Sequence, residues 1–341
     1  MRERHVIDEE LKALLSDPVR LFLTNREAIR RELPMQGAPM HCLCALLCAG
    51  RALRLDAGCV RDMRALIRSR TGPFSYFRGV PMLPLATLLS FSLMPESDLE
   101  RVEKCYAALK AAGFSGSPYL AEAAFLPLAL EGAFDAPACA AAAYDMWRRQ
   151  RKAHPFLSAE TACMYALLAA AQGAEPEGAH RETELGYRLL RTEFPAAGTT
   201  HAAARVLALG PGETEDKCRR AIELYQAMAA RGMKFGRYYE LPALAALALL
   251  PLEPEALAEG AVRTDARLGA EKGFSAWSLQ ASQRRLYAAS LYAVSASAWP
   301  EAAGLEQSVM QSVTGAIIAA QTAACVAASS AAAATAASSG S

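Results

Sequence analysis

Arginine, hydroxyl and aromatic residues that could bind an anion gather in one stretch, residues 67–90. Its middle is a predicted loop with three aromatic residues in four positions: Phe74, Tyr76 and Phe77. Because loops usually lie on the surface, this composition predicts that part of the loop is buried and held rigidly. A rigid guanidinium can bind a carboxylate or phosphate through two parallel hydrogen bonds. We therefore expect an anion-binding set that consists of Arg68, Arg70, Ser75 and Arg78. The alternative is that these arginines are solvated or ion-paired within the fold.

A second candidate for chemistry is His154, which lies in a predicted turn with Glu160 just inside the next predicted helix. A histidine beside a carboxylate can act in general acid–base catalysis. The alternative is that Ser158 caps the helix, Glu160 favours its N-terminal dipole and His154 only closes the turn. His201 begins another predicted helix, where we expect it to act in capping. The sequence contains no phosphate-binding glycine loop, zinc-protease helix or nucleophile elbow.

Nine cysteines are scattered along helical patterns, beside alanine and leucine. His41, Cys44 and Cys48 share one face of a predicted helix, but their spacing matches no zinc module. Free cysteine is among the most buried residue types. We therefore expect reduced, buried thiols in the cytoplasm, with no bound metal and no cofactor.

The formal charge argues against a dedicated nucleic-acid binder. The 36 lysine and arginine residues nearly balance the 35 acidic ones, which gives a net charge of +1. A nucleic-acid-binding protein normally carries a basic excess. Nucleic-acid binding is kept as an alternative that needs seven basic residues on one surface: Arg61, Arg64, Arg68, Arg148, Arg149, Arg151 and Lys152.

Neither end of the chain favours a membrane or an export route. The first residues are charged and contain no apolar leader core. Residues 313–337 are uncharged, but alanine dominates and polar residues intrude, whereas a membrane span needs about twenty strongly apolar residues. We expect a packed C-terminal helix followed by a frayed tail, in a cytoplasmic protein.

The elements that must position these residues form a repeating pattern. A tyrosine followed three residues later by a large apolar residue recurs about every forty residues. The copies are Tyr106/Leu109, Tyr144/Trp147, Tyr187/Leu190 and Tyr225/Met228. Each lies on an amphipathic helical pattern and precedes an Ala/Leu-rich one, and no segment alternates with the period of a strand. The sequence predicts an all-α fold of stacked helical hairpins, α-solenoid-like.

Helix-start signals support this division of the chain. Asp17 before Pro18 and Ser117 before Pro118 predict an N-cap followed by the first helical turn, and Ser97 with Glu100 predicts a capping box. We expect N-terminal helices in residues 1–56, hairpins in 57–250, C-terminal helices in 251–328 and an Ala/Ser-rich tail in 329–341. The first three segments are expected to form one continuous unit, residues 1–328.

Several blocks occur in an order that is similar to one bacterial family. They are IRSRTGPFSYFR at residues 67–78, the Tyr-x-x-Leu-x-x-x-Gly-Phe segment that ends at Phe114, HPFLS at residues 154–158, and a Gln/Ala-rich C-terminal helix. In these blocks the chain resembles the domain of unknown function numbered four thousand and three in its series. The resemblance implies a bacterial, cytoplasmic, all-helical protein without an assigned activity or catalytic residues. The segment AIELYQAMAARGMK also resembles, locally, the first helix of pentatricopeptide repeats, from which no RNA recognition is carried over.

The expected function is that of a non-catalytic helical-repeat binding or scaffold protein. Its partner would be another protein or a small anionic ligand, held in a groove between helix pairs, with nucleic acid and membranes disfavoured. The competing hypothesis is an enzyme that uses the arginines of residues 68–78 together with His154. Convergence of His154, Glu160 and Arg78 in one pocket would favour the enzyme.

Overall fold

The computed structural model describes residues 14–129, 134–157, 161–235, 240–274 and 279–296. This part of the chain contains fourteen α-helices and two short 3₁₀ helices, and no strand. The protein is all-helical, as predicted. Some of the predictions lie outside the described residues: those on Ser158 and Glu160, the C-terminal helix expected before residue 328, and the tail of residues 329–341.

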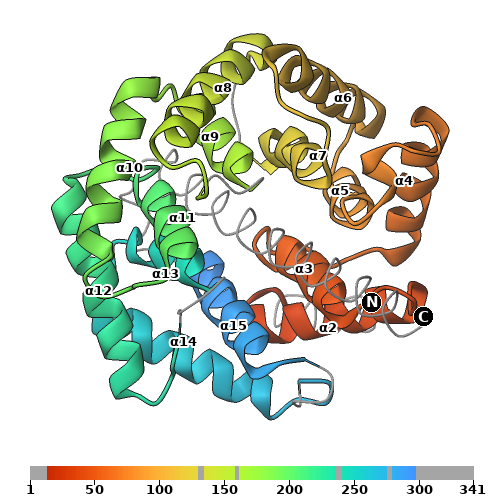
Figure 1. Ribbon diagram of the computed structural model, residues 1–341. Coiled ribbons are helices and arrows are strands. Elements are labelled where there is room, and N and C mark those ends of the chain that lie inside the picture. Colours follow the sequence, from red (N-terminus) through yellow and green to blue (C-terminus); the bar gives the residue numbers. More distant parts are fainter. Residues whose placement is uncertain (1–13, 130–133, 158–160, 236–239, 275–278, 297–341) are drawn as a thin grey trace, which may run out of the picture.

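The helices form an outer and an inner layer, which alternate along the chain (Figure 1). The outer helices are α2 (Pro18–Glu32), α4 (Ala57–Arg70), α6 (Pro95–Ala112), α8 (Ala136–Ala153), α10 (Pro176–Leu190), α12 (Thr214–Ala230) and α14 (Pro254–Gly269). The inner helices are α3 (Ala38–Ala49), α5 (Met82–Leu89), α7 (Pro118–Phe125), α9 (Ala162–Ala171), α11 (Ala197–Leu207), α13 (Leu241–Ala248) and α15 (Ala281–Ala296). Each outer helix packs against the inner helix that follows it, so the chain is a series of hairpins.

Composition explains which helices lie inside. Every residue of α5 and of α13 is buried, because both helices are apolar on all faces. Alanine dominates α9 and α13, and its small side chain lets neighbouring helices approach closely. The outer helices bury one stripe each and expose charged residues on the other side, as α6 does with its glutamates and lysines. The Ala/Leu-rich helices predicted from the sequence are therefore the inner layer.

Two of the three helix starts predicted from capping signals are confirmed, and the third is wrong. The carboxylate of Asp17 accepts hydrogen bonds from the backbone of Val19 and Arg20, and Ser117 caps α7 in the same way. Helix α6, however, begins at Pro95, so Ser97 lies inside its first turn. Proline suits that position because the lost N–H would be unsatisfied there anyway.

One aromatic contact recurs between successive hairpins. A ring in the loop of one hairpin packs edge-on against the tyrosine on the outer helix of the next. The pairs are Phe77–Tyr106, Phe114–Tyr144, His154–Tyr187 and Phe194–Tyr225, with ring centroids 5.0–5.3 Å apart. The four tyrosines thus have similar surroundings, although only Tyr187 is buried and the other three are half-buried. The repeated tyrosine marks the contact between neighbouring hairpins.

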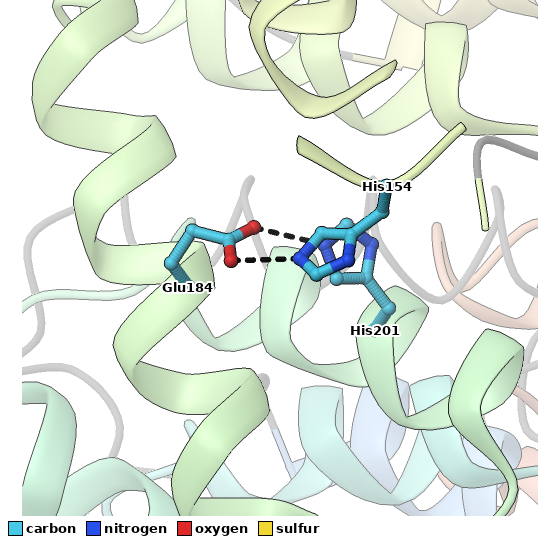
Figure 2. Close-up of side chains that lie close together, drawn as sticks. All are labelled: His154, Glu184 and His201. Carbon is cyan, nitrogen blue, oxygen red and sulfur yellow. Dashed lines mark hydrogen bonds and ion pairs between the residues drawn. The ribbon is translucent and has the colours of Figure 1, made fainter. Parts of the chain in front are cut away.

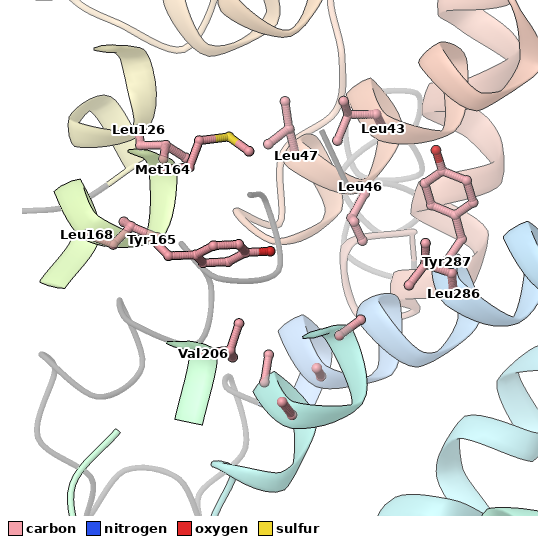
Figure 3. Packing of buried hydrophobic residues seen from close by; sticks show 14 of the residues in the cluster. Leu43, Leu46, Leu47, Leu126, Met164, Tyr165, Leu168, Val206, Leu286 and Tyr287 are labelled. Atoms are coloured by element: carbon pink, nitrogen blue, oxygen red, sulfur yellow. The ribbon is translucent and has the colours of Figure 1, made fainter. Parts of the chain in front are cut away.

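The series of hairpins closes into a ring. Helix α15 packs against α3 and α2, and α14 packs against α2, so that the last hairpin lies beside the first (Figure 1). The rings of Phe22 and Phe274 lie 6.2 Å apart, and the hydroxyl of Tyr287 donates a hydrogen bond of 2.6 Å to the carbonyl oxygen of Pro39. One apolar cluster continues around the inner layer, and Figure 3 shows part of it, from α3, α9, α11 and α15. The packing of neighbouring hairpins agrees with the predicted stacking, whereas the closure of the stack into a ring was not predicted from the sequence.

The expected segment boundaries fall between hairpins. The boundary at 56/57 precedes α4, and the boundary at 250/251 lies between α13 and α14. The hairpins outside residues 57–250 belong to the same ring as those within it. Among the described helices, none combines the length and the apolar character that crossing a membrane requires.

Candidate functional site

The loop expected to bind an anion is held by contacts within the fold. The guanidinium of Arg78 donates hydrogen bonds to the carbonyl oxygens of Arg68 and Thr71, where α4 ends. The hydroxyl of Ser75 accepts a hydrogen bond of 3.3 Å from the backbone of Phe77, which is the one buried aromatic of the three. Arg78 and Ser75 therefore stabilise the junction between α4 and α5, and contact of this loop with a ligand stays a prediction.

The other members of that set lie on the outer surface of α4. Arg70 forms an ion pair of 2.8 Å with Glu103 of α6, and Arg68 is exposed. The side chain of Phe74 is 98 % exposed. The structure thus places Arg68, Arg70, Ser75 and Arg78 around the end of one helix.

His154 follows the last residue of α8, and its side chain meets a carboxylate that the sequence analysis did not consider. The Nε2 atom of His154 lies 2.8 Å from Oε2 of Glu184, on α10. The second oxygen of the same carboxylate lies 3.3 Å from Nε2 of His201, on α11. Figure 2 shows both imidazole rings turned toward Glu184. The three residues form what we call the junction triad, because they lie where the hairpin of α8 and α9 meets the hairpin of α10 and α11.

Helix packing explains how residues so far apart in sequence meet. Glu184 lies one turn before Tyr187 on the face of α10 that turns toward the neighbouring hairpin. Tyr187 contacts His154 and His201 edge-on, at 5.3 and 5.0 Å between ring centroids. The two imidazole rings are themselves 5.0 Å apart. Tyr187 therefore supports both histidines while Glu184 binds them.

Burial sets the charges of the junction triad. His201 is fully buried, whereas the side chains of His154 and Glu184 are 25 % and 26 % exposed. Burial lowers the pKa of His201 to about 4, and the nearby Arg205 acts in the same direction. Burial alone would raise the pKa of Glu184, but hydrogen bonds from the two histidines outweigh it and lower that pKa below its usual value. At neutral pH the site holds a carboxylate and an uncharged, buried imidazole at His201.

A buried cation lies one helical turn beyond His201. Nε of Arg205 donates a hydrogen bond of 2.7 Å to the side-chain oxygen of Gln150, while its Nη2 atom is buried without a partner among the described residues. Burial lowers the pKa of Arg205 to about 10, which still leaves it charged at neutral pH. Its positive field favours the ionised form of Glu184.

A cavity of about 300 Å³ adjoins the same loop. Pro155, which follows His154, lines it, together with Trp147, Arg151, Cys163 and the loop of residues 114–117. The guanidinium of Arg151 lies over the ring of Trp147, 5.0 Å from its centroid. Residues of the hairpin of α6 and α7 and of the hairpin of α8 and α9 thus line this space, beside the junction triad.

Comparison of the chain with models of known protein families identifies one matching family. A family model described as "Protein of unknown function (DUF4003)" matches residues 25–323. The chain belongs to this family. That finding confirms the resemblance drawn from the sequence blocks. No curated protein and no solved structure matches the chain.

Within this DUF4003 protein, the neighbouring junctions serve as internal references for the triad. The position of His154 against the next tyrosine is taken by phenylalanine at the other three junctions: Phe77, Phe114 and Phe194. Three residues before that tyrosine, where α10 has Glu184, the helices α6, α8 and α12 have Glu103, Ala141 and Ile222. Glu103 is ion-paired with Arg70. Of these four described junctions, one combines two histidines with a carboxylate, so the shared fold does not require that combination.

Of the three residues of the triad, the sequence indicates His154 as a candidate for chemistry but not its two partners. His154 was singled out, with Glu160 as its expected carboxylate. Glu184 was missed, although its spacing from the repeated Tyr187 placed it on the face toward the next hairpin. His201 was expected to cap a helix, but it lies buried inside α11. Glu184 is an ionisable residue in phase with the repeated tyrosine, and that spacing is the signal in the sequence that points to it.

The structure separates the residues on which the alternative functions depended. Arg78 contacts the end of α4, whereas His154 contacts α10 and α11. The seven basic residues lie on α4 and α8, and α6 lies between these two outer helices. Arg61 is paired with Glu32, and Arg149 is paired with Asp145. These placements favour neither the enzyme built on Arg78 nor a single basic surface for nucleic acid.

Proposed function

We propose that this DUF4003 protein is a non-catalytic binding protein that holds a small anionic ligand in the cavity beside Trp147. The observation that carries the proposal is Arg151, which lines the cavity and whose guanidinium, stacked over Trp147, has no ion-pair partner among the described residues. Arg148, Arg149 and Lys152, on the same helix, are not among the residues that line this cavity. An anion in the cavity would supply the missing partner.

The surroundings of Arg151 suit a small, partly polar ligand. The volume of about 300 Å³ is at the lower end of small-molecule sites. Stacking on Trp147 holds the guanidinium and leaves its N–H edge to bind a carboxylate or phosphate. The hydroxyl oxygen of Ser117 accepts a hydrogen bond of 3.1 Å from Leu120, so its proton remains to be donated to a ligand. Phe114 and Leu120 supply the apolar part of the lining.

The proposal is tested by ligand-dependent thermal stability. The purified protein would be melted with phosphate, citrate and a set of short carboxylic acids and phosphate esters, alongside mass spectrometry of small molecules that co-purify. At least one anion should raise the melting temperature of the wild type. Arg151→Ala should abolish the shift, whereas Arg148→Ala, an exposed arginine on the same helix, should retain it. An equal shift in Arg151→Ala would contradict the proposal.

We also propose a reducing, cytoplasmic location. The eight cysteines in the described part of the chain form no disulfide there, and six of them are buried. Burial raises the pKa of Cys42 to about 12, so this thiol stays protonated and unreactive. Buried, protonated thiols without disulfides are typical of proteins in a reducing compartment such as the cytoplasm, which supports the proposed location.

A further inference from the structure

We propose that the junction triad, His154, Glu184 and His201, binds a divalent transition-metal ion of the zinc type. This differs from the expectation of no metal, because His154, Glu184 and His201 lie 30 and 17 positions apart along the chain and meet only through helix packing. The inference is independent of the anion cavity, because it uses none of the residues that line that cavity.

The geometry is close to that of a coordination site. One ligand atom from each residue can be chosen so that all three lie within 4.8 Å of one another. Nε2 of His154 and Nε2 of His201 lie 2.8 and 3.3 Å from the two carboxylate oxygens. Zinc bonds of about 2.0–2.1 Å in a tetrahedral arrangement place neighbouring ligand atoms about 3.3 Å apart. Small rotations of the side chains would therefore bring all three onto one ion.

The donor types select the class of metal. Two imidazole nitrogens and one carboxylate oxygen suit zinc, iron, cobalt or nickel, whereas calcium and magnesium prefer sites built from oxygen alone. Three protein ligands leave at least one coordination position open, as in catalytic rather than structural zinc sites. His154 and Glu184 are each about a quarter exposed, so the open position would face their solvent-accessible side.

The competing interpretation is a purely structural cluster, in which two imidazole N–H groups donate to the carboxylate. The other junctions argue against it, because they achieve the same edge-on packing with phenylalanine in place of His154. The cluster also carries a cost to the fold. Nδ1 of the fully buried His201 has no partner among the described residues, and an unsatisfied buried polar atom destabilises a protein. The triad thus lowers the stability of the fold and is not needed for packing at this junction, and both facts are expected of residues that serve to bind an ion.

The test is zinc binding to the full chain, freed of metal with a chelator and titrated by calorimetry. Cobalt serves as a second probe, since its visible absorption reports nitrogen and oxygen ligands directly. The wild type should bind one zinc ion per chain. His154→Phe should weaken zinc binding by about 100-fold or more, since loss of even an outer-shell partner weakens metal sites about 10- to 100-fold. Because phenylalanine occupies the equivalent place at the other junctions, this variant should fold normally.

Controls make the outcome decisive. His180→Gln removes a histidine from α10 that lies outside the triad, and it should bind zinc as the wild type does. Arg151→Ala should also bind zinc normally, which separates this inference from the proposed anion site. Wild-type protein that binds no zinc, or equal binding by His154→Phe, would overturn the inference. Should His154→Phe not fold, Glu184→Gln, which keeps the shape of the side chain, decides in the same way: unchanged binding overturns the proposal, and lost binding supports it.

Discussion

Glu122 is a carboxylic acid buried within the inner helix α7. Both of its side-chain oxygens are buried without a hydrogen-bond partner among the described residues. Burial raises the pKa of Glu122 well above its usual value, because an unpaired charge is poorly solvated there. The folded protein therefore keeps this carboxyl protonated at pH values at which the unfolded chain has lost the proton.

The consequence is a pH-dependent cost that Glu122→Gln should remove. Below about pH 4.5 the carboxyl of Glu122 is protonated in both the folded and the unfolded state, so the free energy of unfolding is not lowered by its burial as an acid that must stay protonated. As the pH rises, the unfolded state releases the proton first, so the free energy of unfolding falls, by at most about 1.4 kcal/mol per pH unit. Urea unfolding at pH 5 and pH 8 should show Glu122→Gln gaining on the wild type as the pH rises. The exposed Glu193→Gln should follow the wild type, and a constant difference for Glu122→Gln would contradict the expectation.

Single residues were recognisable from the sequence only by type. His154 stands out because a histidine in a turn before a proline is chemically conspicuous. Its partner in the structure, Glu184, is thirty positions away, and no local rule connects the two. The same limit applies to Arg205 and Gln150, which meet in the interior across 55 positions. Residue type can be read locally, whereas partnership depends on how helices pack.

At the scale of the helices, Gly113 shows how a turn is coupled to the contact between hairpins. It ends α6 with a φ of 121°, a conformation that residues with a side chain rarely adopt. A Cβ atom at this position would lie 2.6 Å from the ring of Tyr144 on the next outer helix. Gly113→Ala is therefore expected to lower the free energy of unfolding by about 1–3 kcal/mol. Gly72→Ala, where a Cβ would meet nothing within 4 Å, is the matched control in urea unfolding and should change stability little.

Helices were the most predictable level of this structure. Their apolar stripes and N-caps depend on residues a few positions apart, so Asp17 and Ser117 marked helix starts correctly. The capping box at Ser97 predicted the wrong start for α6. Pro95, two residues earlier, is also a helix-start signal, and the helix begins there. Each such signal contributes only about 1 kcal/mol, as a cap does. When two of them compete, the packing of the whole helix determines the residue at which the helix begins.

At the scale of the whole molecule, closure of the ring is what the sequence could not reveal. Hairpin stacking follows from each apolar face, but closure depends on the rotation accumulated from hairpin to hairpin. Tyr287 and Pro39 meet across 248 positions, and no periodicity in the chain encodes that contact. Arg26 reinforces the closing contact, with its guanidinium 4.5 Å from the ring centroid of Phe274 and hydrogen-bonded to the carbonyl oxygen of Gly273.

A double-mutant cycle between Phe22 and Phe274 tests closure in solution. The two rings lie 6.2 Å apart in the ring, but they would be far apart in an open stack of hairpins. Phe22→Leu, Phe274→Leu and the double variant would be compared with the wild type by urea unfolding. Closure predicts a coupling energy of about 0.5–1.5 kcal/mol, as expected for an aromatic pair in contact. Phe22 paired with Phe114, which belongs to a distant hairpin, should show additive effects within about 0.5 kcal/mol. Additivity of Phe22 and Phe274 as well would mean that the first and last hairpins do not meet, and that the molecule is an open array.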